Sequence, residues 1–259
     1  MEHVTLTLEE SGVAIITLDN PKKRNILSRH IMQQLESALL KLSASSTEAK
    51  ALIIRSKYPE FFSAGGDVRE WHSYEKEEAY IEGYKGGKIF DMLENLPFVT
   101  IAAISGSCLG GGCELALACD LRVATSDARF GQPEILLGNG PSWGGYYRLT
   151  RIVGYAKAKE MILLGDSYSA QEASSIGLVN HVTSNWEELL ETVSTIAERA
   201  AKNHDTAAIS KLILNQLGHD LLPTSFVIDA HSAAYFAGTE TSKIRKQAFL
   251  EKRLHEILT

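Results

Sequence analysis

Residues 109–119, with the sequence LGGGCELALAC, decide which fold and which chemistry this chain indicates. Consecutive glycines let the backbone bring its N–H groups close to a ligand, and the helix expected after them adds a partial positive charge at its start. This combination suits a developing oxyanion. A phosphate cradle is the alternative, but the sequence has neither a Walker motif nor a dinucleotide-binding glycine motif.

Glu114 is the one charged residue in this apolar stretch. An isolated buried carboxylate is costly, so it normally shifts its pKa or finds a partner. The alternative is a solvent-facing glutamate on an amphipathic helix. The apolar residues 115–118 leave little polar face for that arrangement, so we expect Glu114 to be buried and functional.

A second glutamate, Glu134, lies in the stretch FGQPEILLG, residues 130–138. Pro133 favours the first turn of a helix, which puts Glu134 in that turn. A glutamate that only pairs with the helix dipole is the alternative there. Glu114 and Glu134 together are a candidate acid and base pair.

A third stretch, FFSAGGD at residues 61–67, again has small residues after a strand-like segment. Small residues free backbone N–H groups, and an oxyanion hole for a thioester needs two converging donors. Ala64 and Gly111 are the predicted pair. Asp67 is expected to cap the following helix, with Glu70 at the position of a capping box.

Taken in order, these motifs resemble the crotonase superfamily, which contains the enoyl-CoA hydratases and isomerases. The matching stretches cover nearly the whole chain and include residues 62–67, 101–106, 110–116, 119–120, 130–138, 148–151 and 248–253. The resemblance implies an α/β fold, a crotonase-like spiral of β-β-α turns with a C-terminal helical trimerisation region. It also implies an acyl thioester of coenzyme A (CoA) as substrate.

The resemblance also implies roles for the two glutamates. Glu114 would activate water for attack on the β-carbon, and Glu134 would protonate the α-carbon. The family's hydratases carry both glutamates, whereas many isomerases keep one, so reversible syn addition of water to a 2-enoyl-CoA is favoured. The alternatives are an isomerase, a hydratase of a branched or cyclic acyl-CoA and, more remotely, a non-catalytic or RNA-binding homologue.

Several further residues belong to the predicted substrate site. Phe249 and Lys252 match positions that contact the nucleotide of CoA from a neighbouring subunit. The remaining predicted contacts are Gly65, Gly66, Asp67 and the basic loop of Lys22, Lys23 and Arg24, whose alternative is a solvated loop.

Ser142 and Trp143 depart from the resemblance. The family's hydratases have a glycine and a very small residue at these positions. An indole at position 143 is therefore expected either to enter the acyl pocket or to pack outward at a subunit contact.

Composition excludes several classes of protein. The 259 residues carry a net charge of −6 and show no basic stripe, which argues against nucleic acid as a partner. The N-terminus resembles no signal peptide and no apolar run reaches the roughly 20 residues that span a bilayer. We expect a cytoplasmic protein that needs no membrane. The cysteines, Cys108, Cys113 and Cys119, fit no zinc pattern, so no metal and no cofactor beyond the substrate's CoA are expected.

Hydrophobic periodicity predicts alternating strands and helices up to about residue 195. Strands are expected at 4–8, 12–18, 51–55, 99–104, 121–124 and 177–182, and helices at 28–43, 154–164 and 170–175. One helix is expected between Asp67 and Leu96. From residue 186 onward the pattern predicts helices with no strand between them, at 186–202, 206–217, 224–236 and 239–258. This change predicts a core, residues 1–195, and a helical oligomerisation region, residues 196–259, in a trimer or a dimer of trimers.

Overall fold

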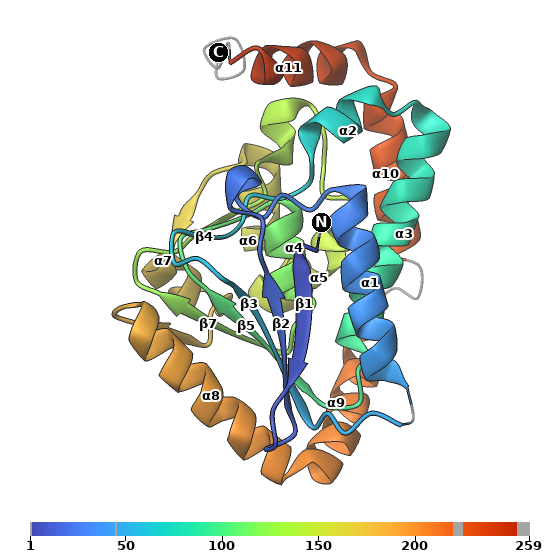
Figure 1. Cartoon of the computed structure of the whole chain (residues 1–259). Helices are drawn as coiled ribbons and strands as arrows, with labels where there is room; N and C mark the ends of the chain where they lie inside the picture. Colours follow the sequence, from blue (N-terminus) through green and yellow to red (C-terminus); the bar gives the residue numbers. More distant parts are fainter. Residues whose placement is uncertain (1, 45, 220–224, 253–259) are drawn as a thin grey trace.

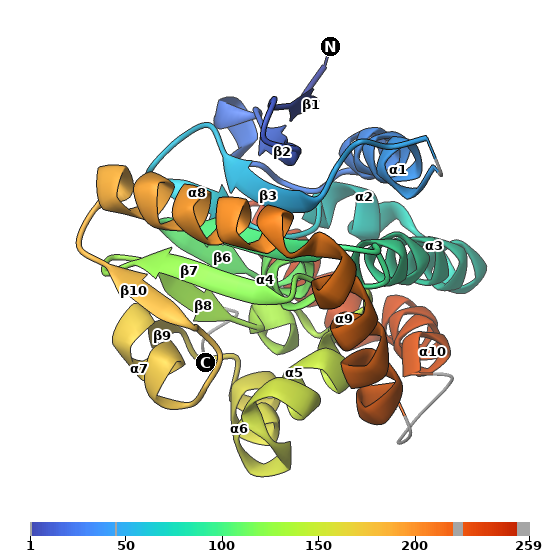
Figure 2. The same cartoon turned by 90° about the horizontal axis from the view of Figure 1, so that it is seen from below.

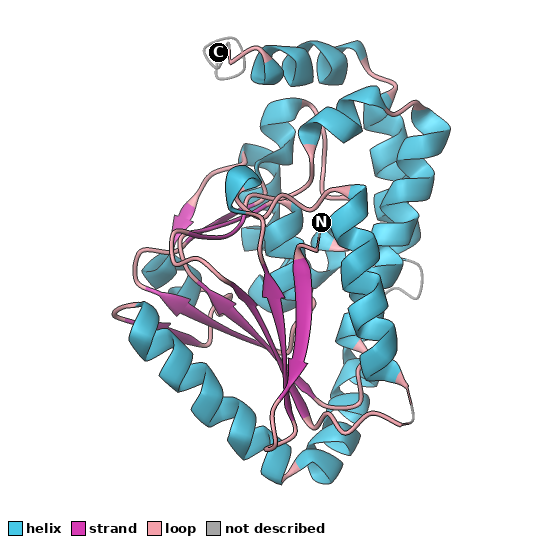
Figure 3. Ribbon diagram, viewed as in Figure 1, coloured by secondary structure: helices cyan, strands magenta, loops and turns pink. Residues whose placement is uncertain are grey.

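A six-stranded sheet forms the centre of the protein (Figures 1 and 3). The structure is a computed structural model that describes residues 2–44, 46–219 and 225–252. In sheet order the strands are β1 (Val4–Leu8), β2 (Val13–Leu18), β3 (Ala51–Ser56), β5 (Val99–Ile104), β7 (Leu121–Thr125) and β10 (His181–Thr183). β1 and β2 are antiparallel, and the other neighbours are parallel. The predicted strands are confirmed within one residue at each end, except that β10 begins at His181 rather than at the predicted residue 177.

A second, smaller sheet has the order β4 (Phe61–Ser63), β6 (Ser107–Leu109), β8 (Arg129–Gly131) and β9 (Tyr168–Ser169). β4, β6 and β8 each follow a strand of the large sheet after a few residues, and a helix follows each of them. This is the β-β-α repeat that the family resemblance implies. Because β4, β6 and β8 are parallel neighbours, their carboxyl ends lie at one edge of the small sheet.

The helices cover both faces of the large sheet (Figure 2). α8 (Trp186–Lys202) packs Leu189, Val193 and Ile196 against β2, β3, β5 and β7. α1 (Arg29–Ser43) and α3 (Lys76–Glu94) bury their apolar faces in the main core on the other side. The predicted boundary after residue 195 falls inside α8, and the division into two units stays a prediction.

The remaining helices complete the fold. They are η1 (Pro21–Lys23), α2 (Val68–Ser73), α4 (Gly111–Leu117), η2 (Pro133–Leu137), α5 (Gly145–Val153), α6 (Tyr155–Leu164), α7 (Ala170–Ser175), α9 (His204–His219), α10 (Ser225–Ala237) and α11 (Glu240–Leu250). α10 lies along α3, and α11 lies across α2 and η2 (Figure 1). Among the residues with a described position, no helix is both long and apolar enough to cross a membrane.

Two predictions about helices are corrected by the structure. The helix expected between Asp67 and Leu96 is two helices, because Tyr74 is extended (ψ 130°) and buries its ring against Trp71. The last helix ends at Leu250, and residues 253–258 of the prediction lie outside the described residues. β6, β8 and β9 of the small sheet are further strands that the hydrophobic pattern does not predict.

Candidate active site

Residues 61–67, 109–119 and 130–138 meet at one cavity, because the strands β4, β6 and β8 that they contain end side by side. About 580 Å³ of space, including its open mouth, lies between these segments and α11. Its lining includes both glutamates and residues of all three segments: Ala64, Gly65, Gly66, Val68, Trp71, Gly110, Gly111, Glu114, Pro133, Glu134, Leu137, Asn139, Gly140, Ser142, Trp143 and Lys246. The sequence prediction that these segments form one site is consistent with this geometry.

The backbone N–H groups of Gly66 and Gly111, both at the cavity, donate to no acceptor among the described residues. They are neighbours, since the Gly66 nitrogen lies 3.3 Å from the position that a Cβ on Gly111 would take. The predicted donor Ala64 differs, because its N–H donates to the Arg24 carbonyl at 3.0 Å. The Ala64 N–H is therefore not free for the predicted pairing with Gly111, whereas the Gly66 N–H is.

Glu114 is buried, as its apolar neighbours indicate, with 2% of its surface exposed. It lies on α4, and its Oε1 accepts N–H bonds from Trp143 at 2.7 Å and Gly145 at 2.8 Å. Burial raises the pKa of Glu114 above its ordinary value, because these N–H groups offset only part of the desolvation. Glu114 is therefore a stronger base than an exposed glutamate.

Glu134 lies in the first turn of η2, after Pro133, as predicted. Its Oε1 is 2.9 Å from the position that a Cβ on Gly110 would take, so a side chain at 110 would displace this carboxylate. In the amide orientation that satisfies both groups, the buried Gln132 Nε2 donates to Oε1 at 3.0 Å and to Oε2 at 3.2 Å. Gln132 thus fixes the position of Glu134.

Comparison with known proteins identifies the family of this chain. A model of the enoyl-CoA hydratase/isomerase family matches residues 8–256. The chain belongs to this family.

Two relatives and one solved structure illustrate the family likeness. A short-chain-enoyl-CoA hydratase of Clostridium acetobutylicum is 36% identical over 255 residues, which are 98% of this chain and 97% of the relative. A crotonyl-CoA hydratase of Syntrophomonas wolfei is 36% identical over 97% of this chain and 96% of its own. The crystal structure of an enoyl-CoA hydratase/isomerase from Xanthobacter autotrophicus matches with a TM-score of 0.87 at 30% identity, covering 99% of this chain and 96% of that chain.

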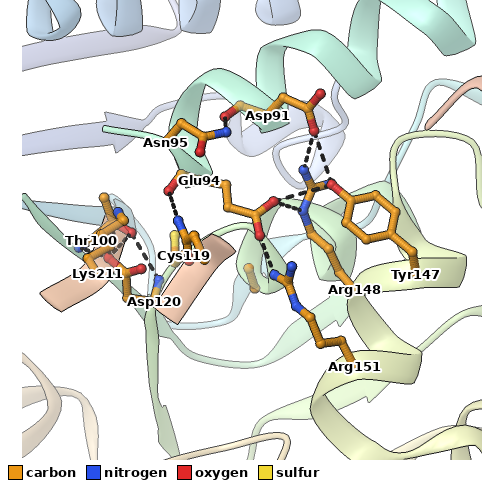
Figure 4. Close-up of polar contacts among 12 residues, drawn as sticks. Asp91, Glu94, Asn95, Thr100, Cys119, Asp120, Tyr147, Arg148, Arg151 and Lys211 are labelled. Atoms are coloured by element: carbon orange, nitrogen blue, oxygen red, sulfur yellow. Dashed lines mark hydrogen bonds and ion pairs between the residues drawn. The ribbon is translucent and has the colours of Figure 1, made fainter. Parts of the chain in front are cut away.

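A buried ion-pair network holds the loop that binds Glu114 (Figure 4). Arg148 is fully buried on α5 and donates through Nη1 to the Trp143 carbonyl at 2.9 Å. Its other nitrogens pair with Glu94 and Asp91 of α3, each at 2.8 Å. Arg151 also pairs with Glu94. Arg148 therefore connects α3 to the residue whose N–H holds the Glu114 carboxylate, which makes it a positioning residue.

The pKa of Glu94 makes this network sensitive to acid. Burial raises the pKa, but the charges of Arg148 and Arg151 outweigh burial and hold it at about 2, below the ordinary 4.5. A carboxylate with a lowered folded-state pKa contributes stability above its ordinary pKa, and this contribution declines as the pH falls towards 2.

We expect Glu94→Gln to lower the free energy of unfolding by about 3 kcal/mol at pH 7. The difference from the wild-type protein should shrink between pH 4.5 and 3, where the wild type loses the same contribution. Urea unfolding at pH 7 and pH 3 measures it, with the exposed Glu191→Gln as control. An equal difference at both pH values would contradict the assignment.

Trp143 points into the protein rather than outward to a subunit contact. Only 5% of its surface is exposed, and its indole packs against Trp71 and Phe90 with ring centroids 6.0 and 5.7 Å apart. A Cβ on Gly86 or Gly111 would clash with this ring. Trp71 and Trp143 also line a second cavity of about 850 Å³ beside α3. The two indoles therefore form a wall between the two cavities.

The structure gives different positions to the two other predicted substrate contacts, Ser142 and Asp67. Ser142 lines the cavity, but its hydroxyl donates to the Gly140 carbonyl at 3.1 Å. Asp67 caps α2 by accepting the Arg69 N–H, and it pairs with Lys23 at 3.1 Å. Glu70 does not complete the capping box, because it accepts the Arg29 N–H instead.

Five predicted basic or aromatic contacts lie away from this cavity. They are Lys22, Lys23, Arg24, Phe249 and Lys252, which are exposed and line neither cavity of their own chain. Their contact with CoA stays a prediction.

Sequence reasoning did not single out Gln132, Arg148 or Lys246 as site residues. One signal for Arg148 is present, because Arg148 and Arg151 have the same spacing as the acidic pair Asp91 and Glu94. Lys246 gives no such signal, since a lysine on a mixed helix is usually solvated.

Proposed function

We propose that the protein is an enoyl-CoA hydratase that adds water reversibly and syn to a 2-enoyl-CoA thioester. One observation carries the proposal: Glu114 and Glu134 line the same cavity as the two unbonded N–H groups of Gly66 and Gly111. Both relatives named above are described as hydratases of short enoyl-CoA substrates. The proposed chemistry uses no cofactor besides the CoA that is part of the substrate.

The Gly66 and Gly111 N–H groups would bind the thioester oxygen. Attack of water on the β-carbon moves negative charge onto this oxygen, so donors aimed at it lower the barrier. One such donor is typically worth about 3 kcal/mol. The Gly111 N–H is fixed by the start of α4, and glycine at 65 permits the φ of +96° that turns the neighbouring Gly66 towards it.

Glu114 would take a proton from the attacking water. Its Oε1 is held by the two N–H bonds of Trp143 and Gly145, and we assign its Oε2 to water. Glu134, held by Gln132, would give a proton to the α-carbon. In the reverse direction the two carboxyl groups exchange these roles.

A comparison of two substrates tests the proposal. We expect crotonyl-CoA to be hydrated to 3-hydroxybutyryl-CoA, and but-3-enoyl-CoA to be isomerised much more slowly. Product analysis by chromatography distinguishes the two reactions. Isomerisation without hydration would support an isomerase and contradict the proposal.

We also propose that the chain assembles as a trimer or a dimer of trimers. α9 exposes the apolar side chains Ile209, Leu212, Ile213 and Leu214, and such a patch commonly marks an interface. Phe249 is 41% exposed and lies away from its own chain's cavity. That position is consistent with Phe249 and Lys252 contacting CoA bound to a neighbour.

A further inference from the structure

Lys246 is a buried lysine in the wall of the cavity that holds both glutamates. It belongs to α11, and only 3% of its surface is exposed. The helix is fixed against η2, since Arg245 Nη1 donates to the Ile135 carbonyl at 3.3 Å. A Cβ on Gly138 would also lie only 2.8 Å from Ser242 Cα. Lys246 is thus placed beside the segment that carries Glu134.

The Lys246 ammonium has no partner of opposite charge within the described residues. Burial lowers its pKa to about 8, and no neighbouring charge contributes to this shift. Lys211 provides a contrast, because this other buried lysine pairs with Asp120 at 2.8 Å and donates to the Phe98 carbonyl at 3.0 Å (Figure 4). A buried ammonium without a partner is costly, so the position of Lys246 needs an explanation.

Two further polar atoms near Lys246 are buried without a hydrogen-bond partner in the described structure. They are Asn139 Oδ1 and Ser242 Oγ. Asn139 lines the cavity, and Ser242 lies one turn before Lys246 on the same side of α11. Trp143 Nε1, in the wall formed by the two indoles, is another such atom. Lys246 and Asn139 both line the cavity, where a ligand would satisfy them.

We propose that Lys246 binds an anionic group on the acyl chain, so that the preferred substrate is a 2-enoyl-CoA whose acyl group ends in a carboxylate. The inference rests on the proposed hydratase function and names its substrate class. An acyl carboxylate suits the position, because Lys246 shares the cavity with the glutamates that act on the acyl carbons. The phosphates of CoA are separated from the thioester by the long pantetheine arm.

The test compares two substrates of similar shape. 4-Carboxybut-2-enoyl-CoA carries the terminal carboxylate, and 5-methylhex-2-enoyl-CoA replaces it with an uncharged isopropyl group. The wild-type protein should favour the first. Lys246→Met should lower the ratio of their kcat/KM values by about ten- to a hundredfold, the usual range for a hydrogen bond between charged groups. Lys243→Met, at an exposed position of the same helix, should leave the ratio unchanged.

Each other outcome has a defined meaning. If Lys246→Met impairs both substrates equally, Lys246 has only a structural role and the inference is overturned. If the variant instead weakens the binding of free CoA, the anion is a phosphate and the inference is also overturned. If Lys246→Met does not fold, Lys246→Gln tests the same ratio. If the protein hydrates crotonyl-CoA but shows no preference for the substrate with a carboxylate, the inference is overturned and the proposed function stands. If it hydrates no enoyl-CoA, the proposed function itself is contradicted.

Discussion

Replacing Glu114 or Glu134 by glutamine should lower the hydration rate by about 10²–10⁴-fold, the usual contribution of a general acid or base. Glutamine keeps the size of the side chain, and in each case an oxygen remains to accept the hydrogen bonds of Trp143 and Gly145 or of Gln132. Folding should therefore survive. Steady-state rates on the best enoyl-CoA substrate measure the effect.

Glu191→Gln on the exposed side of α8 is the control, and it should retain the wild-type rate. The pH dependence gives a second readout. Because burial raises the pKa of Glu114, the wild-type rate should fall as the pH is lowered through this raised pKa, where Glu114 becomes protonated. Near-wild-type turnover by either glutamine variant would show that the two-carboxylate mechanism is wrong.

Trp143→Ala should raise kcat/KM for medium straight-chain enoyl-CoA relative to short ones by about ten- to a hundredfold. The indole forms part of the wall between cavities of about 580 and 850 Å³, so its removal should join them and admit a longer chain. In the wild-type protein the flat apolar ring suits a short, cyclic or unsaturated acyl group. The ratio of kcat/KM for crotonyl-CoA and dec-2-enoyl-CoA measures the change.

Trp186→Ala is the matched control, because Trp186 lies on α8 and lines neither cavity. Its chain-length preference should stay that of the wild type. Light scattering checks that both variants keep the wild-type assembly, which we expect to be a trimer or a dimer of trimers. An unchanged preference in a correctly assembled Trp143→Ala protein would show that the indole does not limit the acyl chain.

Burial of Glu114 could be predicted from the sequence because its near neighbours are all apolar. The strands β3, β5 and β7 were predictable for the same reason, since short apolar runs between turn residues are typical of buried parallel strands. Local composition is sufficient for such features. The position of Glu134 in a first turn likewise follows from Pro133 alone.

Features that depend on distant segments were not predictable in this way. The Arg24 carbonyl, 40 residues earlier in the sequence, accepts the Ala64 N–H. This contact between distant segments determines that Gly66, and not Ala64, has a free N–H. The break between α2 and α3 depends on where the ring of Tyr74 packs. Lys246 is buried because α11 folds back over η2, and no local pattern indicates that contact.

Position 143 combines two independent contributions. Its backbone N–H and carbonyl hold Glu114 and Arg148, and any residue except proline can supply both groups. Its side chain, together with that of Trp71, separates the two cavities. Substrate range can therefore diverge at this position during evolution while the catalytic carboxylate keeps its hydrogen bond.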